Sequence, residues 1–212
     1  MRVFAEYVRK HEIEYRKKTL LFFGNSMELI GSAVLINPGS AKPLKTNDVQ
    51  LVNNFYRSQF PEEHIREIDW KEFRPDSTMR WLKNIFSGHY IGHESTLNGV
   101  IQLFNCFYIK SQNLEHAALQ FPDSEFAFDE ERFFLDKPVF FGWGKHESVR
   151  TKGREIFNSY QLTRADVYNL DYEKNDFYHP GYINRSYKKT VCVRRQLEAF
   201  YRWVNENSPF PL

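Results

Sequence analysis

The chain has little cysteine and no long apolar run. It contains only two cysteines, Cys106 and Cys192, which are too far apart for a Cys-x-x-Cys pair. A disulfide framework or a structural zinc site is therefore not expected, and Cys106, which follows an apolar run, is predicted to be a buried small hydrophobe. No apolar run is long enough to cross a bilayer, and Met1–Lys18 is rich in charge where a signal peptide would be apolar. These features predict a cytoplasmic protein with no membrane partner.

Residues at the spacing of metal ligands are also scarce. The best pair is His89 and His93, with Glu94 beside it. Gly88 and Gly92 disfavour the helix that would place both rings on one face. We therefore expect no metal site, and no motif points to another cofactor.

Neither sign of charge is in large excess. The formal net charge is +2, and 42% of the 212 residues are hydrophobic. That content is enough for one substantial core, so we expect a single domain over residues 1–212. A weakly basic chain permits nucleic acid as a partner but does not require it. The oligomeric state is left open.

Short apolar runs alternate with segments of helical periodicity. Continuous runs of this length are typical of strands buried on both faces of a parallel sheet. The alternation predicts an α/β fold, a three-layer α/β/α sandwich with a mainly parallel central sheet. The predicted strands are residues 19–23, 32–36, 100–104, 138–141 and 166–170, and the predicted helices are 47–60, 77–86, 114–119, 147–160 and 187–206.

Residues 42–74 show the least regular pattern in the chain. Charges of both signs are interspersed along this segment. Such a pattern is typical of a solvated surface. We therefore predict a peripheral insertion with one helix.

The motif Asn37-Pro38-Gly39-Ser40-Ala41 directly follows a predicted strand. Pro38 restricts its own φ and that of its neighbour, and Gly39 permits a positive φ. The amides of Gly39, Ser40 and Ala41 would then face one concavity, which is how backbone nests hold anions. The alternative is an ordinary turn at the end of a strand.

Five motifs in a fixed order resemble a bacterial family of unknown function. Its members carry L-N-P-S-T-A, D-P-T-I-R-R, N-L-F, W-G and H-P-L-Y in that order, and the resemblance covers about residues 15 to 185. The corresponding segments here are Asn37–Ala41, Asp76–Arg80, Leu103–Asn105, Trp143–Gly144 and His179–Tyr182. The resemblance implies that these loops meet at one site. Its ligand-binding residues would be Pro38, Gly39, Ser40, Ala41, Thr78, Arg80, Asn105, Trp143 and Tyr182.

The order of motifs is also similar to that of the uracil-DNA glycosylase superfamily. Members have a strand ending in a motif like G-I-N-P-G, a later strand ending in L-L-L-N, another reading V-F-L-L-W-G, and a loop reading H-P-S. The resemblance implies that Asn37 positions a hydrolytic water, that Asn105 reads a base edge, and that His179 donates a hydrogen bond to a developing oxyanion. Here Leu35 and Gly181 depart from the superfamily pattern.

The sequence is compatible with two classes of function. The first is a site for a nucleotide- or nucleic-acid-related ligand, with hydrolysis of an N-glycosidic bond as the reaction and Asn37, Asp76 and His179 as catalytic residues. The second is a binding or accessory protein that keeps the fold without the chemistry. Because an amide is a poor base, an enzyme would need a second acid–base group such as Asp76 or His179.

Three residues each have a structural alternative. Asp76 or Ser77 is a candidate helix N-cap, and Asp76 is also a candidate ion-pair partner of Arg80. Trp143 is either a core side chain or a stacking surface, with the core favoured. His179 serves either the site or the turn.

Overall fold

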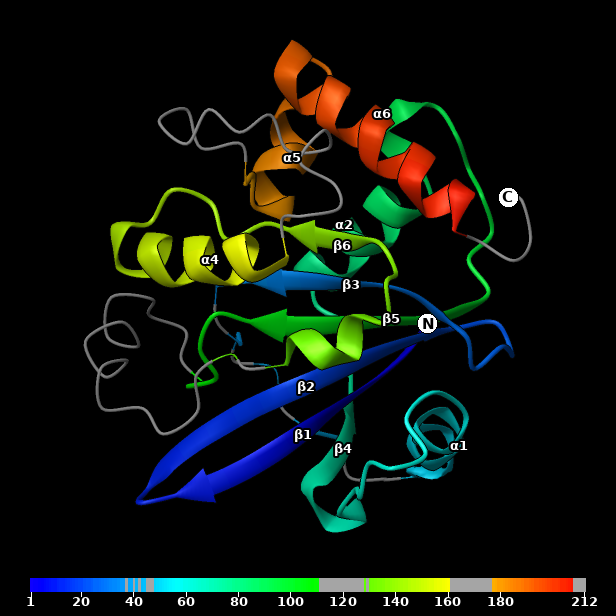
Figure 1. The fold of residues 1–212 in the computed structure, drawn as a ribbon, viewed down its shortest axis with the longest axis vertical. Coiled ribbons are helices and arrows are strands. Elements are labelled where there is room, and N and C mark those ends of the chain that lie inside the picture. The colour runs from blue at the N-terminus through cyan, green and yellow to red at the C-terminus, as the bar shows by residue number, and fades with distance from the viewer. Residues whose placement is uncertain are drawn as a thin grey trace.

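The computed structural model describes residues 1–36, 38, 39, 41, 43, 44, 48–110, 128, 130–160 and 177–207. These residues form an α/β fold around a six-stranded sheet with the strand order β4-β1-β2-β5-β3-β6 (Figure 1). The predicted helix 114–119 and strand 166–170 lie outside the described residues.

Three parallel strands form one half of the sheet. They are β3 (Leu29–Leu35), β5 (Gly99–Asn105) and β6 (Val139–Phe141), and every residue of β5 and β6 is buried. Strand β3 lies between the other two and pairs in parallel with both. The apolar runs therefore predicted these three strands correctly.

A long antiparallel hairpin forms the other half of the sheet. Strand β1 (Arg2–Lys10) pairs with β2 (Ile13–Phe23), and β4 (Trp70–Phe73) pairs with the outer side of β1. The hairpin turns at His11 and Glu12, both with positive φ. The predicted strand 19–23 is the carboxyl-terminal part of β2, whereas β1 and β4 were not predicted.

The prediction of a mainly parallel sheet is wrong, because the sheet is mixed. The pairings β1–β2, β1–β4 and β2–β5 are antiparallel, and only β3–β5 and β3–β6 are parallel. All three antiparallel pairings involve β1 or β2, and only residues 19–23 of this hairpin were predicted as a strand. The charged residues of Met1–Lys18 interrupt the apolar runs from which the other strands were predicted.

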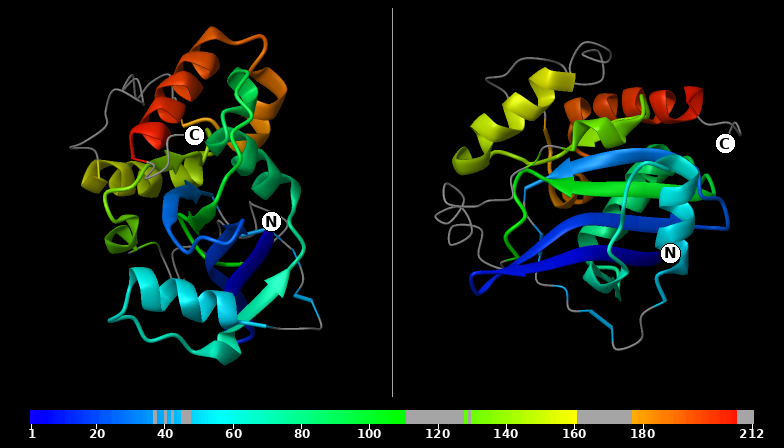
Figure 2. Two further views of the ribbon diagram at one scale, coloured as in Figure 1. Left: turned by 90° about the vertical axis from the view of Figure 1, so that its right-hand side faces the viewer. Right: turned by 60° about the horizontal axis from the view of Figure 1, so that its bottom comes forward.

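Helices cover both faces of the sheet (Figure 2). Helix α1 (Gln50–Gln59), the 3-10 helix η4 (Glu131–Phe134) and α4 (Glu147–Tyr160) pack on the first face, where Phe55 contacts Phe22 and Phe157 contacts Phe141. Helices α2 (Ser77–Phe86) and α6 (Val191–Glu206) pack on the second face. Phe200 of α6 contacts both Phe86 of α2 and Phe140 of β6. Short helices α5 (Pro180–Ser186), η1 (Glu67–Asp69) and η2 (His89–Ile91) complete the described elements.

Helical periodicity predicted the longer described helices well. Helices α1, α2 and α4 lie at the predicted 47–60, 77–86 and 147–160. The predicted helix 187–206 begins later, at Val191, because α5 and a turn precede it. None of the helices in the described ranges is long and apolar enough to cross a membrane.

The segment 42–74 lies at the edge of the sheet, and several of its side chains belong to the hydrophobic core. It supplies the edge strand β4, and Phe55, Tyr56 and Trp70 are each at most 2% exposed. The Tyr56 ring packs against Trp70 and against Phe133 of η4. The mixed charges are therefore the outer surface of a segment whose inner side is apolar.

Candidate functional site

Three of the segments named by the sequence motifs, after residue 36, at Asn105 and at Trp143–Gly144, follow the parallel strands β3, β5 and β6, which end at one edge of the sheet. Leu35 at the end of β3 lies opposite Asn105 at the end of β5, and Val34 lies opposite Phe141 at the end of β6. Since parallel strands share their carboxyl edge, the segments after them start close together. Asn37 and Ser40 lie outside the described residues, so the structure does not place them.

Asp76 begins helix α2 at this edge. Its Oδ1 accepts a hydrogen bond from the Met79 amide at 3.0 Å, as an N-cap side chain does. Its Oδ2 lies 3.9 Å from the position of a β-carbon built on Gly39. Gly39 therefore lies beside the start of α2, with one carboxylate oxygen of Asp76 near it.

His179 begins helix α5 at the same edge. Its Nδ1 accepts a hydrogen bond from the Gly181 amide at 3.1 Å, and Pro180 occupies the first helical position. Because Nδ1 is the acceptor, the proton of the neutral ring is on Nε2, which remains a donor. The segment after residue 179 is thus the start of a helix and not a free loop.

The pKa of His179 is lowered from its ordinary value. Burial of the ring is the main cause, and the positive charge of Arg185 acts in the same direction. The negative charge of Asp76 opposes them and raises the pKa of His179. The imidazole is therefore neutral at pH 7. It interacts electrostatically with the Asp76 carboxylate at the start of α2.

Gly144 connects the third loop to this group. A β-carbon built on Gly144 would lie 3.7 Å from the His179 β-carbon, and the Gly144 amide donates to the Phe177 carbonyl at 2.7 Å. Gly39, Asp76, Gly144 and His179 thus form one neighbourhood, which we call the carboxyl-end cluster. It joins four segments that are widely separated in the sequence.

Asn105 ends β5 as a buried amide. It is 2% exposed, and its Nδ2 has no hydrogen-bond partner among the described residues. It shares a sheet face with Ile101 and Leu103, because side chains alternate along a strand. That face is the one that α2 covers, since Gly31, opposite Ile101, approaches the Phe86 ring. A buried unpaired amide costs free energy unless a ligand or water satisfies it.

The structure places Trp143 in the core, which is the alternative that the sequence favoured. Trp143 is 0% exposed and stacks on Phe177 with ring centroids 4.4 Å apart. A β-carbon on Gly153 of α4 would lie only 2.5 Å from its indole. Phe177 and Gly153 of α4 therefore both contact the indole, as neighbours of a core side chain do, and its place in the ligand-binding set stays a prediction.

The remaining predicted residues surround the carboxyl-end cluster to different degrees. Arg80 is exposed, and its guanidinium donates to the Pro75 carbonyl at 3.1 Å, so the described contacts do not include an ion pair with Asp76. Tyr182 is 42% exposed and stacks on Tyr178. Pro38 is buried, and Ala41 and Thr78 are half-buried.

The two histidines considered as a metal pair have other contacts. Gly88 and Gly92 are both left-handed, with φ of 71° and 90°, and they bound a 3-10 helix instead of an α-helix. His89 lies 3.7 Å from Glu94, whereas His93 stacks on the Tyr201 ring. Within the described ranges no three His, Cys, Asp or Glu residues are grouped as metal ligands would be.

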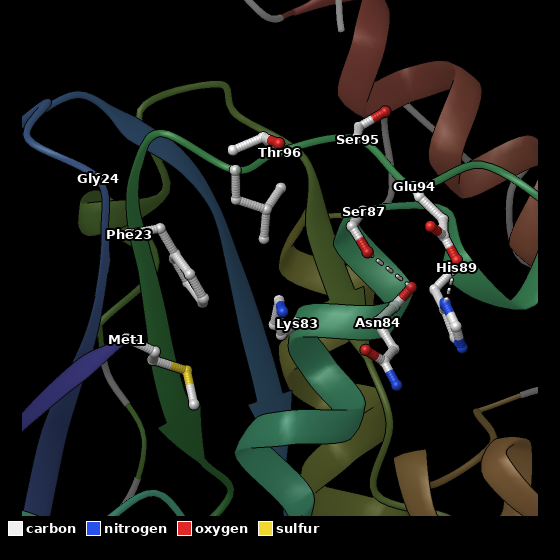
Figure 3. Close-up of a pocket in the computed structure, with 11 residues that line it drawn as sticks. Met1, Phe23, Gly24, Lys83, Asn84, Ser87, His89, Glu94, Ser95 and Thr96 are labelled. Atoms are coloured by element: carbon white, nitrogen blue, oxygen red, sulfur yellow. Dashed lines mark hydrogen bonds and ion pairs between the residues drawn. The ribbon is translucent and has the colours of Figure 1, made fainter.

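A separate cavity of about 580 Å³ lies at the opposite, amino-terminal end of β3 and β5 (Figure 3). Lys83, Asn84 and Ser87 from the end of α2 form one wall of this cavity. Its other lining residues are Met1, Phe23, Gly24, His89, Glu94, Ser95, Thr96 and Leu97. None of the predicted site residues is among them.

Sequence reasoning missed one charged residue on the sheet face that α2 covers. Arg16 of β2 is only 2% exposed, although it lies in a stretch that reads as solvated charge. Its two following neighbours, Lys17 and Lys18, are less deeply buried and lie near Glu130. Local sequence carries no signal that separates these three cations, because their burial depends on which sheet face each one occupies.

Comparison with models of known protein families, with curated protein sequences and with solved structures found no match for this chain.

Proposed function

We propose that this protein binds a nucleotide- or nucleic-acid-related ligand at the carboxyl-end cluster and hydrolyses its N-glycosidic bond. The observation that carries the proposal is the arrangement of His179. Its Nδ1 is held by the Gly181 amide, so the Nε2 donor has a fixed orientation. Asp76, from a helix start 103 positions earlier (179 − 76), acts electrostatically on the same ring.

The chemistry requires stabilisation of a leaving base. As the bond between sugar and base breaks, its electron pair moves onto the base and charge develops on a base oxygen. A neutral imidazole donates a hydrogen bond to that oxygen, and such donors supply a large share of catalysis. The oxygen of a water then bonds to the anomeric carbon, and the proton that this water loses passes through an acid–base group to the departing base.

Asp76 is the nearby group that can assist the water. Its Oδ1 is engaged by the Met79 amide, while Oδ2 is directed toward Gly39. A carboxylate at this position accepts a proton more readily than an amide does. The role of Asn37 in positioning the water stays a prediction.

A non-catalytic binding protein is the second candidate, and the same contacts favour it in one respect. Asp76 and His179 each cap a helix through one side-chain atom. Capping by itself explains why a carboxylate and an imidazole stand at these positions. The two candidates therefore differ only in what the second atom of each side chain does.

The test is release of free base from a panel of normal and modified nucleosides, nucleotides and single-stranded oligonucleotides. His179→Asn keeps an acceptor at the capping position but loses the distal donor, whereas His179→Gln keeps a distal donor. We expect His179→Asn to lower the rate by about 100- to 1,000-fold, as loss of one oxyanion donor does, and His179→Gln to lower it less.

The outcomes separate the two candidates. Equal activity of wild type and His179→Asn would make His179 purely structural. If wild type releases no base from any member of the panel but binds some of them, the protein is a binding protein. Thermal unfolding of each variant provides the control that the fold is intact.

A further inference from the structure

Arg16 is a buried cation with unsatisfied nitrogen atoms. It is 2% exposed, and among the described residues its Nε and Nη1 have no hydrogen-bond partner. The guanidinium lies over the Phe73 ring at 5.1 Å from the ring centroid. Burial raises the pKa of Tyr7, and the Arg16 guanidinium opposes this by its charge and by a hydrogen bond. The neighbours of the guanidinium are thus the Phe73 ring and the Tyr7 phenol, and neither carries a negative charge that would neutralise it.

The next two residues, Lys17 and Lys18, differ from Arg16 because each lies near a carboxylate. Lys17 Nζ and Lys18 Nζ lie 4.0 and 3.7 Å from the Glu130 carboxylate. No described carboxylate forms an ion pair with Arg16. A buried charge without a partner is strongly unfavourable, so an anion is expected to complete this site.

Strand register places Arg16 on the α2 side of the sheet. Tyr7 lies opposite Arg16 and Ala5 opposite Thr19, with a register shift between the two pairs. The shift leaves Lys17 and Lys18 together on the first face, near Glu130, and returns Arg16 to the same face as Thr19. Thr19 in turn lies opposite Leu103, which shares its face with Asn105.

Two further unsatisfied polar atoms lie on this face. Thr19 Oγ1 and Asn105 Nδ2 are buried and have no hydrogen-bond partner within the described part of the chain. A hydroxyl, an amide and a guanidinium can all donate to an anion. Their shared lack of partners therefore indicates the same kind of occupant.

The loop after β3 links Arg16 to the carboxyl-end cluster. The Tyr7 hydroxyl donates to the Ala41 carbonyl at 3.1 Å, while Gly39, two residues earlier, is adjacent to Asp76. Tyr7, the neighbour of Arg16, and Asp76 therefore contact residues of the same short loop.

We propose that Arg16 binds the phosphate of the ligand, so that the substrate class is a phosphorylated nucleotide and not a free nucleoside. This rests on the proposed function for the base and sugar, but the phosphate site is testable alone. A guanidinium offers several donors to a phosphate and remains charged when desolvated.

The experiment is calorimetric titration of the intact protein with inorganic phosphate, a nucleoside, its 5′-monophosphate, and an oligonucleotide without a terminal phosphate. The variants are Arg16→Met, Arg16→Lys, and the exposed Arg195→Met as matched control. We expect Arg16→Met to weaken phosphate and 5′-monophosphate binding by about 10- to 100-fold, as loss of a charged hydrogen-bond partner does. Arg16→Lys should lose less, and Arg195→Met should match wild type.

Ligand-free stability is the second readout. Because Arg16→Met removes an uncompensated buried charge, its melting temperature without phosphate should equal or exceed that of wild type. A lower melting temperature together with unchanged phosphate affinity would show that Arg16 is structural and would overturn the proposal. Absence of phosphate and 5′-monophosphate binding by wild type would also overturn it.

The results with the different ligands and variants separate the phosphate site from the proposed glycosidic chemistry. Phosphate binding that depends on Arg16, without any release of base, would retain the phosphate site and reject the glycosidic chemistry. Base release that is equally efficient from nucleosides and nucleotides, and that Arg16→Met does not change, would retain the glycosidic chemistry and reject the phosphate site. Tighter binding of the oligonucleotide than of the 5′-monophosphate would assign the anion site to a strand backbone and contradict the nucleotide proposal.

Discussion

At the scale of single residues, His179 uses its two nitrogens for different purposes. Nδ1 accepts from the Gly181 amide at the start of α5, which leaves Nε2 as the donor. Protonation of Nδ1 would abolish this acceptor, so burial and capping both favour the neutral ring. The same residue therefore couples helix stability to pH.

We predict that His179 makes the folded protein less stable as the pH falls below about 6.5. Its pKa in the folded state is lowered from the ordinary 6.5 that it regains on unfolding. Between these two values the unfolded chain binds a proton that the folded chain does not, so the free energy of unfolding decreases as pH decreases. Urea unfolding at pH 7.5 and 5.5 measures the change, and His179→Asn should reduce it. Equal pH dependence in both proteins would contradict the prediction.

Asp76 also has two separable effects. Asp76→Ala removes the cap of α2 and should lower the free energy of unfolding by about 0.5–2 kcal/mol. Asp76→Asn keeps a capping oxygen and should change stability little. Because the Asp76 charge raises the pKa of His179, both variants should lower that pKa further, which NMR titration of the His179 ring measures. An unchanged His179 pKa would show that the two groups do not interact.

At the scale of elements, the register of β2 has the largest functional consequence. A single shift between Ala5 and Tyr7 sends Lys17 and Lys18 to one face and Arg16 to the other. Neither face is apparent from the run of three cations in the sequence. A one-residue change in register exchanges every side chain between the two faces, so pairing decides which cation is buried.

We predict that the segment 42–74 cannot be removed or loosened without loss of the fold. Trp70 of β4 is 1% exposed, whereas Ile68, two residues earlier, is 71% exposed. Trp70→Ala should therefore lower the free energy of unfolding by about 3–5 kcal/mol, and the matched Ile68→Ala by less than about 0.5 kcal/mol. Denaturant unfolding measures both. Similar small effects would indicate that the segment is a dispensable insertion.

At the scale of the whole molecule, one hydrophobic cluster joins the hairpin half and the parallel half of the sheet. Phe4 of β1, Phe55 of α1, Phe141 of β6 and Phe200 of α6 all belong to it. Shared burial across the sheet favours unfolding in one step.

We predict a single cooperative unfolding transition. Tryptophan fluorescence reports on all four tryptophans, of which Trp70 in β4 and Trp143 after β6 lie at opposite edges of the sheet. Far-ultraviolet circular dichroism reports on the helices. Both signals should give the same midpoint in urea. Different midpoints would show that the two halves unfold independently.

The sequence by itself determined the elements whose signals are local. Helical spacing predicted α1, α2 and α4, and apolar runs predicted β3, β5 and β6, because each pattern depends on neighbours within a few residues. It also predicted Asp76 or Ser77 as the N-cap of α2, and the N-cap is Asp76.

Only the tertiary structure decided which side chains meet. Asp76 and His179 interact because two helices begin at one sheet edge, and Trp143 is enclosed because Gly153 of α4 leaves room for its indole. Arg16 is buried because Tyr7 of β1 and Phe73 of β4 lie against it, and β4 is distant from it in the sequence. Burial and charge pairing are sums over distant neighbours, so a local pattern of charged residues predicts a solvated surface even where the fold encloses one of them.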